Sequence, residues 1–194
     1  MGAHDLTPGA QARIDPCLPA VLRPLAQLMI WVNRVMVGLG MLALLAASLI
    51  LTSSVASRYF FKASTDWQDE ASVFCLVGTT FLCSAFLQSL RGHVGIEAVV
   101  GLMPVWANRV RQALVDLMCL LFCAFFAWKS WALFHEAWVD GQTTSSSWAP
   151  PLWIPYGLMS LGMTLVTIQF LLQCTASLNA LRPAVARAAE EIAA

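Results

Sequence analysis

Apolar residues are concentrated in four stretches, each about as long as a membrane-crossing helix. They cover about residues 31–57, 67–91, 112–138 and 153–175. Roughly 20 consecutive apolar residues span the hydrocarbon core of a bilayer as an α-helix. Within each stretch the apolar residues adjoin one another and do not alternate with polar ones, which argues against the strands of a transmembrane barrel. The pattern therefore predicts four transmembrane helices.

The composition also points to lipid as the surrounding solvent. Of the 194 residues, 59% are hydrophobic and 11% are charged, whereas soluble domains average about 45–50% and 25%. We therefore predict an all-α integral membrane protein with a four-helix transmembrane domain over 27–178. We expect residues 1–26 to be a loosely ordered cytoplasmic segment, since they are polar and proline-broken and do not resemble a secretory signal. Residues 179–194 form a cytoplasmic tail in this scheme.

Positive charges flank the four spans unevenly. The side that holds both termini and the second loop carries seven arginines: Arg13, Arg23, Arg91, Arg109, Arg111, Arg182 and Arg187. The other side carries Arg58 and Lys62. Because cytoplasmic loops are enriched in Lys and Arg, both termini are predicted to be cytoplasmic. Four tryptophans are then expected at the outer interface: Trp67, Trp138, Trp148 and Trp153.

The second span opens with the acidic stretch STDWQDE, residues 64–70. Thr65 and Gln68 match a helix capping box, and Asp66 is a second candidate cap. The positive end of the helix dipole also stabilises carboxylates in the first helical turn. Capping therefore explains the stretch without a binding site, but it does not explain Trp67 or the deeper Glu70. These two residues either contact a partner or only start and anchor the helix.

Three ionisable residues lie inside predicted spans. Arg34 and Asp116 are near the cytoplasmic ends of spans one and three, where they either pair or extend toward the interface. Lys129 lies deeper, toward the outer third of span three, where a charge is expensive. Glu70 is a candidate partner for Lys129 at similar depth.

Small residues recur at helical spacing in the first two spans. They are Gly40, Ala43 and Ala47 in span one, and Ser72, Cys75, Thr79 and Cys83 in span two. Such stripes let helices approach closely, either within this chain or against another membrane protein. The six cysteines include no CxxC pair, so we expect packing roles for them.

One face of the third span is aromatic. It carries Trp128, Trp131, His135 and Trp138. An interfacial belt is favoured over a haem pocket, because His4 and His93 lie outside the spans and cannot supply a second membrane ligand. We therefore expect no cofactor.

A set of short motifs appears in a fixed order between residues 58 and 159. They are Arg58-Tyr59 after the first span, Trp67-x-x-Glu70 opening the second, Gly92-His93-Val94 in the loop, Met103-Pro104, and SSWAPPLWIPYGLM over 146–159. Over about 27–175, the chain resembles the small membrane subunit of tripartite ATP-independent periplasmic (TRAP) transporters. Glu97 departs mildly from this pattern, since the family often has Asp there.

The resemblance implies a non-catalytic subunit in a bacterial inner membrane. Its expected partners are a large elevator-type membrane subunit and a periplasmic substrate-binding protein, in ion-driven, typically sodium-driven, uptake of an organic acid. Nucleic acid is not an expected partner. Residues expected at the partner interface are Arg58, Trp67, Glu70 and Lys129. Residues expected near cytoplasmic lipid headgroups are Arg34, Arg91 and His93.

Two other classes of protein fit the sequence less well. A self-sufficient small transporter needs a deep carboxylate in a span, and the one candidate, Glu70, lies near the surface. A membrane redox subunit needs paired membrane histidines or an outward-facing cysteine pair, and the sequence has neither. The residues alone favour a partner protein over a transporter that works by itself.

Overall fold

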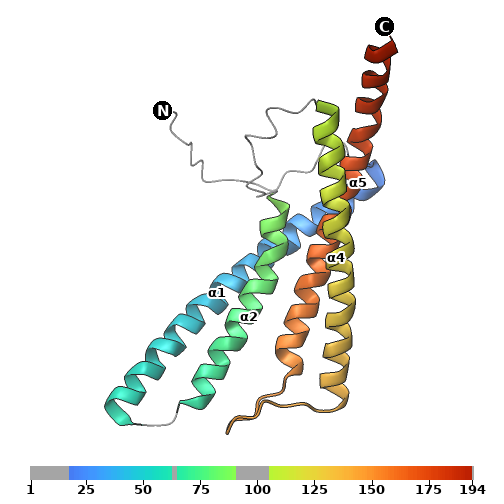
Figure 1. Ribbon diagram of the computed structural model, residues 1–194. Helices are drawn as coiled ribbons and strands as arrows, with labels where there is room; N and C mark the ends of the chain where they lie inside the picture. Colours follow the sequence, from blue (N-terminus) through green and yellow to red (C-terminus); the bar gives the residue numbers. More distant parts are fainter. Residues whose placement is uncertain (1–17, 63–64, 91–104, 194) are drawn as a thin grey trace, which may run out of the picture.

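The computed structural model describes residues 18–62, 65–90 and 105–193. A short 3-10 helix and four long α-helices make up this part of the chain (Figure 1): η1 (Ala20–Leu22), α1 (Arg23–Phe61), α2 (Asp66–Ser89), α4 (Val105–Val139) and α5 (Trp153–Ala193). All four α-helices are long and apolar enough to cross a membrane. The predicted all-α fold with four membrane-spanning helices is confirmed.

The helices form two antiparallel pairs. α1 and α2 join at the lower left of Figure 1, and α4 and α5 join at the lower right. We call the end with these two connections the hairpin end, and the opposite end, which carries the N-terminus of α1 and the C-terminus of α5, the terminal end. α5 packs against α4 on one side and against α2 on the other, while α1 packs along α2. Among the described elements α4 has an extended contact with α5 alone, so the four helices form an open array.

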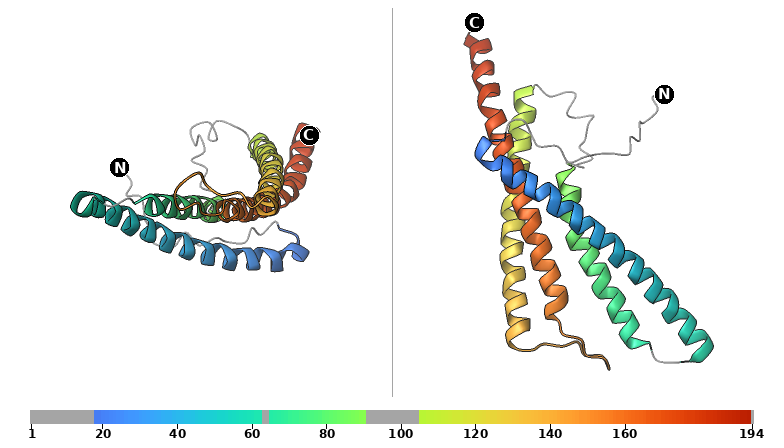
Figure 2. Two further views of the ribbon diagram at one scale, coloured as in Figure 1. Left: turned by 90° about the horizontal axis from the view of Figure 1, so that it is seen from below. Right: turned by 180° about the vertical axis from the view of Figure 1, so that it is seen from behind.

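α1 is long because it crosses its neighbours obliquely. It has 39 residues, about 58 Å of helix, against 24 residues in α2, about 36 Å. Figure 2 shows α1 running at an angle on one side of α2 and α5. The helix begins at Arg23, ahead of the expected span at 31.

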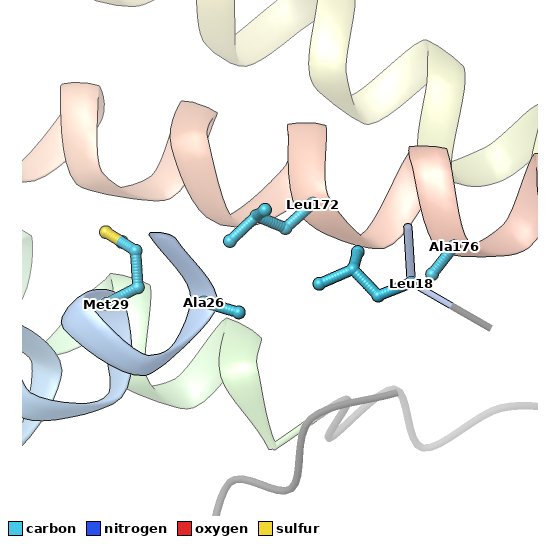
Figure 3. Packing of buried hydrophobic residues seen from close by; sticks show 5 residues of the cluster. All are labelled: Leu18, Ala26, Met29, Leu172 and Ala176. Atoms are coloured by element: carbon cyan, nitrogen blue, oxygen red, sulfur yellow. The ribbon is translucent and has the colours of Figure 1, made fainter. Parts of the chain in front are cut away.

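The N-terminal part of α1 is fixed against α5. Leu18, Ala26 and Met29 are buried together with Leu172 and Ala176 of α5 (Figure 3). Burial of apolar surface among helices therefore begins well before the first expected span.

Small residues make two of the helix contacts close. Between α1 and α2, a Cβ at Gly40 would collide with Cys83 Sγ, and Thr79 Oγ1 donates to the Gly40 carbonyl at 3.0 Å. Between α2 and α5, a Cβ at Gly162 would collide with the backbone of Phe81. The small stripes of spans one and two thus pack against each other within the chain.

The cysteines of the spans take part in the same packing. Cys123 is buried with Ala85 and Phe170, and Cys119 packs against this cluster. None of the described cysteines is in a disulfide. The packing role expected from the sequence fits these positions.

Polar side chains connect helices toward the terminal end. Gln88 of α2 donates to Gln173 of α5 at 2.8 Å, and Gln173 Nε2 donates back to the Gln88 carbonyl at 2.9 Å. Asn33 of α1 donates to Gln169 of α5 at 3.4 Å. Hydrogen bonds of this kind contribute about 0.6 kcal/mol each between membrane helices. They hold the chain's own helices in register.

Asp116 does not pair with Arg34. Its side chain is 1% exposed and accepts a 2.5 Å hydrogen bond from Ser177 Oγ of α5. Arg34 is exposed on α1. Of the two alternatives that the sequence leaves open, the ion pair is not formed, because α1 reaches α5 on a different side from α4.

Candidate partner-binding sites

A polar cluster lies where α1 meets α2. Arg58 near the end of α1 forms an ion pair with Asp69 of α2 and donates through Nε to Thr65 Oγ1 at 2.5 Å. Ser54 Oγ donates to the other oxygen of Asp69 at 3.1 Å. Both charged side chains are about half exposed, so the pair contributes little stability by itself. Its effect is to set how the two helices meet.

The expected capping box is not formed. Thr65 is the N-cap of α2 as predicted, but its side chain caps no backbone N–H. Its hydroxyl instead accepts from Arg58, and Gln68 Oε1 is buried without a hydrogen-bond partner among the described residues. A long-range contact with α1 therefore replaces the local cap.

The connection between α4 and α5 folds over the start of α2. Ser147 Oγ donates to Asp66 Oδ2 at 3.2 Å. The rings of Trp67 and Trp148 meet edge to face, with centroids 6.4 Å apart. Because residues 140–152 are thereby tied to α2, the two helix pairs are linked at the hairpin end as well as in the middle.

The four tryptophans expected at one interface do gather at one end. Trp67 contacts Trp148, and Trp138 contacts Trp153 with centroids 4.9 Å apart. Trp67 is 50% exposed. The hairpin end therefore presents an aromatic and acidic surface, which we call the hairpin rim and define by Asp66, Trp67, Asp69, Trp148 and the nearby Glu70.

Glu70 and Lys129 do not meet. Glu70 is on α2, and one of its carboxylate oxygens, Oε2, is buried without a hydrogen-bond partner in the described part of the chain. Lys129 is exposed on α4, a helix that has no extended contact with α2. The pairing weighed from the sequence is therefore wrong. It failed because α2 and α4 are not neighbours, and because Glu70 lies in the first turns of α2 while Lys129 lies ten residues inside the end of α4.

Lys129 is surrounded by aromatic rings of its own helix. Its Nζ lies 5.0 Å from the ring centroid of Trp128 and 6.0 Å from that of Phe125. Contacts of an ammonium with ring faces are attractive. The lysine thus has partial compensation for its place in a span.

Two of the expected belt residues lie apart from the tryptophans of the hairpin end. Trp131 donates through Nε1 to Thr164 of α5 at 3.0 Å. Trp131 lies seven residues from Trp138, about 10 Å along the helix. Trp128 lies ten residues from Trp138, about 15 Å along the helix. Trp138 lies with the tryptophans of the hairpin end, and a belt position for Trp128 and Trp131 stays a prediction.

The remaining expected site residues divide between exposed and undescribed positions. Arg34 lies on an exposed part of α1 near the terminal end. Arg91 and His93 lie outside the described residues. Two pairings have no local sequence signal and so could not be predicted: Asp69 with Arg58 and Ser147 with Asp66.

Four apolar helices of spanning length define a multi-pass membrane protein. Residues 47–179 match the family described as tripartite ATP-independent periplasmic transporters, DctQ component. The chain therefore belongs to the DctQ family of TRAP transporter components, and it is a multi-pass protein of the bacterial inner membrane.

Two curated proteins illustrate this relationship. One is the C4-dicarboxylate TRAP transporter small permease protein DctQ of Vibrio cholerae, which is 22% identical over 147 residues that cover 65% of this chain and 63% of that protein. The other, from Haemophilus influenzae, is named as a TRAP transporter small permease protein and is 22% identical over 128 residues, covering 66% of this chain and 75% of that protein. The chain thus spans less than two thirds of the Vibrio relative. No solved structure matches it significantly.

Proposed function

We propose that this chain is the non-catalytic small membrane subunit of a TRAP transporter. It binds a large membrane subunit that carries the substrate path, and its outer surface helps a periplasmic substrate-binding protein to dock. The transporter takes up an organic acid by ion-coupled, sodium-driven symport. The name of the Vibrio relative supports a C4-dicarboxylate as the first substrate to test.

The observation that carries this proposal is the open array of helices in a chain of this family. Only 11% of the most apolar stretch of α1 is buried within the chain. The buried share of the corresponding stretch of α4 is 22%. The polar residues buried between the helices bond to one another, as in Gln88 with Gln173 and Asp116 with Ser177. The spans therefore use their polar groups for internal packing and leave long outer faces for contact with a larger membrane protein.

The hairpin rim is proposed to face the periplasm. The Lys and Arg excess on the terminal side supports this orientation. The gathered tryptophans of the hairpin end also suit an interface with water. A periplasmic protein would then meet the exposed Trp67 and the carboxylates beside it.

Purification of the tagged protein from its native membranes in mild detergent tests the proposed function. We expect a large membrane protein with many more spans to co-purify in stoichiometric amount and to be identified by mass. A tag placed on an unrelated inner-membrane protein controls for non-specific capture. Recovery of this chain only as a homo-oligomer would overturn the proposal and favour a self-sufficient small transporter.

Replacing Trp67 with alanine is expected to weaken docking of the binding protein by about tenfold or more. Exposed tryptophans at an interface often contribute at least 1.4 kcal/mol, and Trp67 is 50% exposed. Docking is measured on right-side-out vesicles with binding protein added from outside, which also tests the proposed orientation. Substrate affinity of the isolated binding protein should not change.

The matched control is Trp31→Ala. Trp31 is 65% exposed but lies toward the terminal end of α1, so its loss should leave docking unchanged. Loss of the large subunit from the Trp67→Ala complex would instead assign Trp67 to the contact between the two membrane subunits. If both variants dock the binding protein as well as the unaltered chain does and keep the large subunit, Trp67 belongs to neither interface.

A further inference from the structure

α4 has two faces of opposite character. The face against α5 is lined by small or short side chains, each buried: Ala113, Asp116, Cys123, Ala127, Ser130 and Ala137. The opposite face carries large exposed residues at helical spacing: Met118, Phe122, Phe125, Lys129 and Leu133. We call this second set the outer face of α4. Lipid alone would suit its apolar members but not its lysine.

The register with α5 places Lys129 near the middle of the span. Trp138 pairs with Trp153 at the hairpin end, and Asp116 bonds to Ser177 toward the terminal end. Lys129 lies nine residues from Trp138 and thirteen from Asp116, about 14 Å and 20 Å along the helix. A bilayer core is about 30 Å thick, so the Lys129 backbone lies close to its midplane. This is deeper than the outer third expected from the sequence.

The side chain of Lys129 does not reach toward the nearer interface. Helical side chains lean toward the helix N-terminus, and for α4 this direction leads away from Trp138. Its Nζ accordingly lies 6.0 Å from the centroid of Phe125, one turn toward the terminal end. The ammonium is thus held at depth by the rings of its own helix, where aromatic contacts offset only part of the penalty for a buried charge.

No carboxylate of the described chain meets this ammonium. The one ion pair among the described residues joins Arg58 to Asp69. Glu136, on the same helix, lies two turns away and accepts from Gln142 at 3.4 Å. Glu70 belongs to α2, which α4 does not contact extensively. Charge complementarity therefore has to come from another molecule.

We propose that the outer face of α4 packs against a transmembrane helix of the large subunit that carries an Asp or Glu near mid-membrane, paired with Lys129. This inference rests on the proposed function and adds to it the contact face and the chemistry of the partner helix. Phe122, Phe125 and Leu133 would supply the packing, and the ion pair would fix depth and rotation of one helix against the other. Such a pair is specific in the membrane core, because a lysine placed against a helix without a carboxylate would be left unpaired and unhydrated.

The first test compares Lys129→Glu and Lys129→Arg in the complex purified with the large subunit. We expect Lys129→Glu to lower co-purification of the large subunit at least tenfold, and Lys129→Arg to retain most of it. The amount of each variant in the membrane is measured in parallel. Restored co-purification of Lys129→Glu by changing one spanning Asp or Glu of the large subunit to Lys would identify the partner residue.

The second test does not depend on insertion of an altered charge. A photo-crosslinking amino acid is placed at Phe122, which is 66% exposed on the outer face, in a chain that keeps Lys129. A crosslink to the large subunit supports the proposal. A crosslink to a second copy of this chain, or to lipid only, overturns it, as does full co-purification by Lys129→Glu.

The two proposals fail in different ways. If the unaltered chain captures no large membrane protein, the proposed function fails. If it captures one while Phe122 crosslinks only lipid and Lys129→Glu binds normally, only the assignment of the α4 outer face fails.

Discussion

Replacing Gly162 with valine is expected to separate α5 from α2 and to destabilise the protein by about 1–3 kcal/mol, the usual range for overpacking. A Cβ at this position would lie 2.6 Å from the carbonyl carbon of Phe81. That atom belongs to the helix backbone and cannot rotate away. The two helices must therefore move apart. The midpoint of thermal unfolding in detergent measures the effect.

Gly38 provides the matched control. It lies in α1, and a Cβ there would have nothing within 4 Å. Gly38→Val should therefore leave the unfolding midpoint almost unchanged. Gly40→Ala should fall between the two, because its Cβ would meet Cys83 Sγ, the end of a side chain that can rotate. Equal midpoints for the Gly38 and Gly162 variants would show that close approach at Gly162 does not hold the helices together.

Much of the fold could be predicted from the sequence because lipid imposes simple rules. A long uncharged run must be a helix, since unsatisfied backbone groups are expensive in hydrocarbon. The number of spans followed from this rule. The small-residue stripes indicated a close helix approach without saying whether the neighbour is in this chain, and Gly40 with Thr79 shows that it is. The clustering of Trp67 with Trp148 at one end followed from the preference of indole for the interface.

The pairing of side chains between helices could not be predicted in the same way. Only an approximate depth along a span can be read from the sequence, as the depth of Lys129 shows, and the rotation of each helix and its neighbours cannot be read at all. Arg34 with Asp116, and Glu70 with Lys129, were matched by depth, and both pairs face different neighbours in the structure. Asp116 bonds to Ser177 because α4 lies along α5. Asp69 pairs with Arg58 because the short connection brings the ends of α1 and α2 together.

The oblique path of α1 was also beyond sequence reasoning. Its apolar pattern fits a single crossing at 31–57, yet the helix extends back to Arg23. The reason is tertiary: Ala26 and Met29 bury against Leu172 and Ala176 of α5. Helix ends in this protein are thus decided by which neighbour is available, as well as by local residue preference.

Removing the hydroxyl of Ser177 is expected to have an effect out of proportion to its size. Ser177 Oγ donates a 2.5 Å hydrogen bond to Asp116, whose side chain is 1% exposed. Leaving a buried polar group without its partner costs about 1–3 kcal/mol, and more when the group is charged. Ser177→Ala should therefore lower the free energy of unfolding by about 1–3 kcal/mol or more. Denaturant unfolding in mixed micelles measures this change.

Ser130 offers a control of the same chemistry in the same helix interface. It is also 1% exposed, but its hydroxyl bonds to the Phe126 carbonyl of its own helix at 2.8 Å. That carbonyl keeps its helical hydrogen bond when the hydroxyl is lost. Ser130→Ala is therefore expected to change the free energy of unfolding much less than Ser177→Ala.

The double variant Asp116→Leu with Ser177→Ala tests the physical cause. Removing both partners of a buried hydrogen bond can be almost neutral, because no unpaired group remains. The double variant should therefore be more stable than Ser177→Ala alone, and the coupling free energy between the two positions should be about 1–3 kcal/mol. Additive losses at the two positions would show that Asp116 does not depend on Ser177, and that the α4–α5 contact is held by its small apolar residues without help from this bond.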